Sequence, residues 1–176
     1  MKRIQDNKGF TLIELLIVVA IISIIAAIAV PGLLRARMTG NETSAIASLK
    51  VTTSSQVAYT ASWGSGGYAA SYAVLGTPPT GTTEAFISSD LGHAAPIVKS
   101  GYAFAMGAGA GSVAGPNDGA GTATISAYLA SATPQTFGTT GTRHFAVNAG
   151  NTIWQNTANA AITEPFTASA TVTPIQ

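Results

Sequence analysis

Cysteine is absent from this chain of 176 residues, which excludes a disulfide framework, a cysteine-ligated metal site and a thiol nucleophile. Charged side chains are also scarce, because they make up 9% of the sequence against about 25% in an ordinary globular protein. The basic residues are too few to build a surface that captures nucleic acid, so we expect no nucleic-acid partner. Only two histidines occur, His93 and His144, and neither belongs to a spaced set of ligands. We therefore expect no metal site and no cofactor.

Signals of catalysis are lacking as well. The acids of the C-terminal part are scattered through the sequence, and no pair of carboxylates or set of Ser, His and Asp stands out. The segment 109–114 formally fits the dinucleotide fingerprint G-x-G-x-x-A, but a turn and a second strand signal follow it instead of a helix. We expect a flexible Gly/Ala loop there and predict that the protein is not an enzyme.

What the sequence has in excess is a long apolar run near its N-terminus. Between Leu15 and Val30 the only polar side chain is Ser23, and Glu14 stands at the head of the run. The 25 residues from Phe10 to Leu34 are enough to span a hydrocarbon layer of about 30 Å. A carboxylate at the centre of a membrane helix costs about 2.5–3.5 kcal/mol, and such residues are functional candidates. Glu14 therefore needs a partner.

Two ordinary interpretations explain only part of this segment. A secretory signal peptide cut near Ala29 would leave Val30 as the mature N-terminus. Its apolar core of 19 residues would be longer than the roughly 7–15 residues usual for the apolar region of such peptides. A signal peptide that is removed would also not explain the carboxylate of Glu14. A plain membrane anchor accounts for the length, and the basic residues before the run weakly favour a cytoplasmic N-terminus. It leaves the carboxylate unexplained.

A third interpretation gives Glu14 a local role. Thr11 to Glu14 fits the S/T-x-x-E capping box, in which the two side chains cap the first turn of a helix. Capping is worth about 1 kcal/mol, which is less than the cost of placing the charge in a membrane. Capping alone therefore does not account for Glu14, although one side chain can serve both roles.

The stretch from Lys8 to Glu14 reads Lys-Gly-Phe-Thr-Leu-Ile-Glu and continues as Leu-Leu-Ile-Val-Val. It resembles the prepilin signature of type IV pilins and type II secretion pseudopilins. The resemblance implies that residues 1–9 are a leader, which a prepilin peptidase removes by cutting between Gly9 and Phe10 on the cytoplasmic side. The same enzyme then N-methylates Phe10. In these families the new amine is thought to pair with the carboxylate at the position of Glu14 on a neighbouring subunit.

The resemblance also implies where the subunit is located before and after assembly. The subunit would wait in the inner membrane as a single-pass protein with a cytoplasmic N-terminus. An assembly platform in that membrane would then build it into a homopolymer, an extracellular pilus or a periplasmic pseudopilus. Major secretion pseudopilins carry a calcium site in the head, and the sequence has no clustered Asp/Asn loop to build one. This difference favours a pilus subunit.

The fold that we expect is α+β and pilin-like, with one long N-terminal helix packed on a small antiparallel sheet. The helix has an apolar half, residues 10–34, and an amphipathic half, residues 35–62, whose spacing places Leu49 and Val57 on the inner face and Glu42 on another. Pro31 and Gly32 interrupt the apolar run, and the resemblance implies a kink there rather than a helix end.

Beyond the helix we expect a connection and then a head. Residues 63–100 read as an irregular loop with a short helical turn between Thr83 and Leu91. The head, residues 101–176, contains alternating segments that predict three to four strands. These segments are residues 101–106, residues 122–129, and a hairpin formed by 143–148 and 152–154. The Thr-rich end, residues 167–176, is expected to add an edge strand at most.

Overall fold

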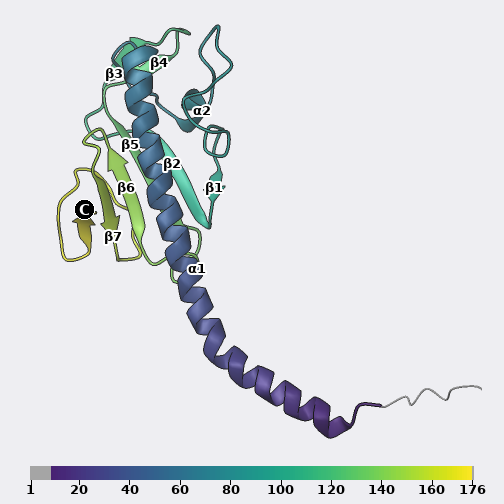
Figure 1. The fold of residues 1–176 in the computed structure, drawn as a ribbon. Helices are drawn as coiled ribbons and strands as arrows, with labels where there is room; N and C mark the ends of the chain where they lie inside the picture. Colours follow the sequence, from purple (N-terminus) through teal and green to yellow (C-terminus); the bar gives the residue numbers. More distant parts are fainter. Residues whose placement is uncertain (1–8, 176) are drawn as a thin grey trace, which may run out of the picture. The chain divides into compact units, whose positions relative to one another are not determined.

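The computed structural model of the chain describes residues 9–175 (Figure 1). Apart from Gly9, the predicted leader lies outside the described residues. The structure confirms a mixed fold with one long N-terminal helix and an antiparallel sheet. The chain divides into two compact units, of which the first ends at Ala36 and the second begins at Arg37.

Helix α1 begins at Leu12 and ends at Ser62, which makes 51 residues. Pro31 lies inside it without ending it, whereas the kink at Pro31 and Gly32 stays a prediction. At the far end, the N–H groups of Trp63 and Gly64 both donate to the Tyr59 carbonyl, at 2.9 and 2.7 Å. A Cβ at Gly64 would lie 2.6 Å from the Tyr59 ring, so only glycine fits where the chain leaves the helix.

The main sheet is fully antiparallel and has the strand order β1-β2-β5-β6-β7-β8. Its strands are β1 (Ile97–Lys99), β2 (Tyr102–Ala108), β5 (Tyr128–Pro134), β6 (His144–Asn148), β7 (Ile153–Asn156) and β8 (Val172–Pro174). A separate two-stranded sheet pairs β3 (Ala114–Asn117) with β4 (Ala123–Ile125). The predicted three to four strands were too few for the main sheet. The strand that the sequence did not predict is β1, whose three residues are too few to show alternation, whereas β8 is the edge strand expected within the Thr-rich end.

Two local predictions were wrong in detail. Residues 122–129, expected as one strand, divide between β4 and β5, because Ile125 exchanges both backbone hydrogen bonds with Tyr68 and the chain then changes partners. The expected turn between Thr83 and Leu91 is not helical. A four-residue helix, α2, forms instead at Tyr72–Leu75, where the Ser71 side chain accepts a hydrogen bond from the Val74 N–H. The hairpin of β6 and β7 is confirmed.

The part of α1 that follows Arg37 lies across one face of the main sheet (Figure 1). Alternate residues of β5 from Tyr128 to Pro134 are buried, as expected of a strand with one face on a core. The helix face that meets this core differs from the predicted one. Leu49 is fully buried, but Val57 is 50% exposed and Glu42 is only 5% exposed.

The buried face of α1 is largely polar. It carries Glu42, Ser48, Thr52, Ser55 and Gln56 besides Ala45, Leu49 and Tyr59. The side chains of Glu42, Thr52, Ser55 and Gln56 have hydrogen-bond partners, as burial requires. Gln56 donates from Nε2 to the Ala69 carbonyl and accepts from the Ala69 N–H, both at 2.9 Å. The polar face therefore fastens the helix to the chain that follows it through hydrogen bonds.

Candidate functional site

The candidate site begins at the first turn of α1, where Thr11 and Glu14 form the capping box. The Thr11 N–H donates to Glu14 Oε2 at 2.9 Å, and the Thr11 hydroxyl donates to the same oxygen at 2.6 Å. In return, the Glu14 N–H donates to Thr11 Oγ1 at 3.3 Å. Glu14 therefore has a local role in holding the start of the helix.

The capping box uses only one carboxylate oxygen of Glu14. Both bonds from Thr11 end on Oε2, and within residues 9–175 no hydrogen bond or ion pair is formed by Oε1. A carboxylate has about four acceptor positions on its two oxygens. The geometry therefore allows Glu14 to cap its own helix and to accept a second donor at the same time.

Gly9 and Phe10, the predicted cleavage site, are exposed. The Phe10 side chain is 87% exposed, and a Cβ built on Gly9 would meet nothing within 4 Å. A peptidase and methyltransferase needs such access to the bond between these residues. Cleavage and methylation there remain predictions.

The helix that follows presents an apolar surface to its surroundings. Every large apolar side chain from Leu12 to Leu34 is about half exposed or more, with values from 49% at Val18 to 77% at Ile28. Ser23 donates its hydroxyl to the Val19 carbonyl at 2.8 Å, so its polarity is satisfied inside the helix. By length and composition α1 can cross a membrane. So large an apolar surface calls for lipid or other protein around it.

The other candidates from the sequence do not form a site. His93 is exposed. His144 on β6 is buried and stacks on Phe137, with 5.7 Å between the two ring centroids. Across the described residues, no group of three or more His, Asp or Glu side chains could hold a metal ion. The segment 109–114 leads from β2 into β3 without a helix.

An ion pair that the sequence did not reveal joins α1 to the residues just before β6. Arg143 donates from Nε and Nη2 to Glu42 Oε2 at 2.9 and 2.7 Å. Thr142 donates its N–H and hydroxyl to Glu42 Oε1 at 2.8 and 2.9 Å. Burial raises the pKa of the Glu42 carboxyl, but these four donated bonds outweigh it, so the pKa is lowered. The partners lie about a hundred residues apart, and no local pattern signals such a pair.

Comparison with known protein families finds a match to the N-terminal segment. Residues 4–30 match the family model described as the prokaryotic N-terminal methylation motif. This range contains Gly9, Phe10 and Glu14 and the apolar start of α1. The chain therefore carries a prokaryotic N-terminal methylation motif.

Similarity to individual proteins is also confined to a part of the chain. The chain is 62% identical over 39 residues to the type IV wide pilus major component PilA4 of Thermus thermophilus, which covers 22% of this chain and 30% of that protein. It is 45% identical over 53 residues to the type IV major pilin protein PilA of Myxococcus xanthus, covering 30% of this chain and 24% of that protein. The resemblance to type IV pilins is thus confirmed, but the chain spans less than a third of either relative. No solved structure matches the chain significantly.

Proposed function

We propose that the protein is the structural subunit of a type IV pilus-like filament. It is made as a precursor, cut between Gly9 and Phe10 by a prepilin peptidase, and N-methylated on Phe10 by the same enzyme class. It catalyses nothing itself. The observation that carries the proposal is a single carboxylate, Glu14, at the start of an apolar helix segment whose large side chains from Leu12 to Leu34 are all about half exposed or more. The methylation motif and the resemblance to type IV pilins support it.

Processing would create the partner that Glu14 needs. Cleavage turns the neutral amide nitrogen of Phe10 into an amine, and methylation leaves its positive charge in place. Opposite charges about 4 Å apart attract by about 4 kcal/mol at an effective dielectric constant of 20, against about 1 kcal/mol in water. This gain is of the same order as the cost of placing Glu14 in an apolar layer. A subunit in another register would leave the charge unpaired, so the pair selects the register.

The rest of the helix surface would provide cohesion. Before assembly, the segment 10–34 lies in the inner membrane with a cytoplasmic N-terminus. An assembly platform in that membrane then moves the subunit into the filament, where the same surface packs against other copies. Transmembrane helices associate with one another through close packing and polar contacts. The filament would be extracellular. A periplasmic pseudopilus of type II secretion is the second candidate, because secretion pseudopilins share the N-terminal signature.

Mass spectrometry of the mature protein tests the processing step. The proposal expects a chain that starts at N-methylated Phe10. A signal peptide would leave Val30 as the first residue, and a plain anchor would keep Met1. A bulky substitution at the cleavage site, Gly9→Val, should leave the precursor uncut and unable to assemble, whereas Gly40→Ala, on an open stretch of α1, should be processed normally.

Two matched substitutions separate pairing from capping. Glu14→Gln keeps an acceptor for the capping box, which works with Gln as well as Glu, but removes the charge. Thr11→Val removes the capping hydroxyl but keeps the charge. If Glu14 pairs with the Phe10 amine, filaments seen by electron microscopy are lost in Glu14→Gln and persist in Thr11→Val. The reverse outcome would leave Glu14 with capping alone and would remove the basis of the proposal.

A further inference from the structure

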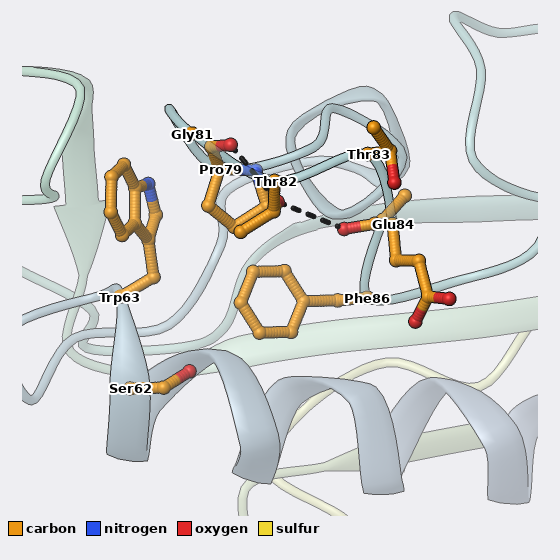
Figure 2. Close-up of a pocket in the computed structure, with 9 residues that line it drawn as sticks. Ser62, Trp63, Pro79, Gly81, Thr82, Thr83, Glu84 and Phe86 are labelled. Atoms are coloured by element: carbon orange, nitrogen blue, oxygen red, sulfur yellow. Dashed lines mark hydrogen bonds between the residues drawn. The ribbon is translucent and has the colours of Figure 1, made fainter.

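An open cavity lies where α1 ends and the following loop folds back over it. It measures about 720 Å³ and is lined by Ser62, Trp63, Pro79 and residues 81–86. Figure 2 shows the rings of Trp63, Pro79 and Phe86 grouped above the end of α1, with the Glu84 carboxylate on the side of Phe86 that faces away from Trp63. The cavity therefore combines aromatic and apolar walls with one negative charge.

The polar groups of this cavity favour a donor with a positive charge. The hydroxyl of Ser62 donates to the Ala58 carbonyl at 2.6 Å, and that of Thr82 donates to the Pro79 carbonyl at 3.0 Å. The Glu84 side chain is exposed, and its carboxylate forms no ion pair or hydrogen bond with residues 9–175. An ionised carboxylate only accepts hydrogen bonds, and aromatic faces attract cations. A long aliphatic side chain that ends in a cation would fit this cavity. Its stem would pack on the apolar walls, and its charge would suit both the aromatic faces and the carboxylate.

The charges of the head leave one lysine without a partner. Glu42 is paired with Arg143, and Asp90 with Lys99 at 2.6 Å. Lys50 lies on the exposed side of α1, and within the described part of the chain its ammonium group has no carboxylate within ion-pair distance. Lys50 and Glu84 are thus complementary charges that are not used within one copy.

The two groups lie on opposite sides of the head. Lys50 borders a cavity with Ile153 of β7 and Ile175, next to the β8 edge of the sheet. Glu84 belongs to the loop that precedes β1, and this loop lies on the β1 side (Figure 1). A contact between unlike surfaces of two copies can repeat from copy to copy, and it builds an open filament when the rotation between copies does not close a ring.

We propose that the cavity around Trp63, Phe86 and Glu84 receives the Lys50 side chain of a neighbouring copy. The lysine stem lies against the two rings, and its ammonium group donates to the Glu84 carboxylate. This inference rests on the proposed filament function and adds to it a contact between heads. It is independent of the pairing between Glu14 and Phe10.

Zero-length crosslinking of purified filaments tests the contact. A water-soluble carbodiimide activates the Glu84 carboxylate, the Lys50 amine attacks it to form an amide, and the carbodiimide leaves as its urea. We expect a joined peptide that contains both residues, identified by mass spectrometry. Lys50→Arg keeps the charge but cannot form this amide, so its filaments should lack the joined peptide. Lys99→Arg, the matched control, should retain it, because Lys50 and Lys99 are the only lysines after the predicted leader.

Mixed filaments show whether the link joins two copies. Filaments assembled from Lys50→Arg and Glu84→Gln copies can form the amide only between different copies, so the joined peptide should reappear in the mixture. Wild-type filaments without the joined peptide would overturn the contact, and so would its absence from the mixture. A wild-type protein that forms no filaments would instead refute the proposed function, so the two failures are distinguishable.

Discussion

Removing Arg143 should destabilise the head more than neutralising its partner Glu42. The Glu42 side chain is 6% exposed and that of Arg143 is 32% exposed. Arg143→Met deletes both bonds to Glu42 Oε2 and leaves a buried carboxylate that only Thr142 still contacts. Breaking a buried pair in this way costs about 3–5 kcal/mol. Because Arg143 is partly solvated and Thr142 still donates two bonds, we expect a smaller loss, about 2–3 kcal/mol.

Glu42→Gln should cost less, about 1–2 kcal/mol. The amide oxygen can still accept from Thr142, and the partly exposed guanidinium of Arg143 keeps its bond to Gln155 Oε1 at 2.7 Å. Arg143→Lys should fall between the two, because it keeps the charge but loses the two-pronged geometry.

The assay is urea unfolding of the full chain in detergent micelles, followed by the fluorescence of Trp63 and Trp154. The midpoint should shift most for Arg143→Met and least for Glu42→Gln. Equal or reversed shifts would refute the reasoning, because they would mean that the buried charge is not the costly element.

The same pair makes stability depend on pH in a defined direction. The pKa of Glu42 is lowered in the folded protein, and an unfolded Glu titrates near pH 4.3. The stabilisation is therefore complete above about pH 4.3 and is lost as the pH falls through the folded pKa. Glu42→Gln should remove this part of the acid sensitivity.

Three further predictions concern the head. Burial lowers the pKa of His144, so the neutral ring is favoured in the folded state and stability should fall as the pH drops below about 6.5. His144→Gln should flatten the pH dependence of the free energy of unfolding between pH 7 and 5. Gly64→Ala places a Cβ 2.3 Å from a carbonyl oxygen and should lower the free energy of unfolding by about 1–3 kcal/mol, whereas Gly107→Ala, with nothing within 4 Å, should not clash. Gln56→Leu strands two buried backbone groups and should cost about 2–4 kcal/mol in the same urea assay.

Much of the candidate site was readable without a structure because its signals are local. The motif around Gly9 and Glu14 is contiguous, and the apolar run needs no partner within the chain to be recognised. The capping box also follows from a spacing of three residues between Thr11 and Glu14. The long helix and the β6–β7 hairpin could be predicted for the same reason, since helix periodicity and turn residues are properties of neighbouring positions.

The sequence by itself determined the N-terminal segment of this protein, namely its methylation motif, its apolar run and the carboxylate of Glu14 at the head of that run. Only the tertiary structure decided which face of α1 is buried. Glu42 was expected on another face of the helix, but Arg143 satisfies it in the core, where Gln56 likewise bonds to Ala69. The short edge strand β1 and the cavity at Glu84 likewise could not be predicted from the sequence. Contacts between residues far apart in sequence leave no local periodicity, so only the folded chain brings them together.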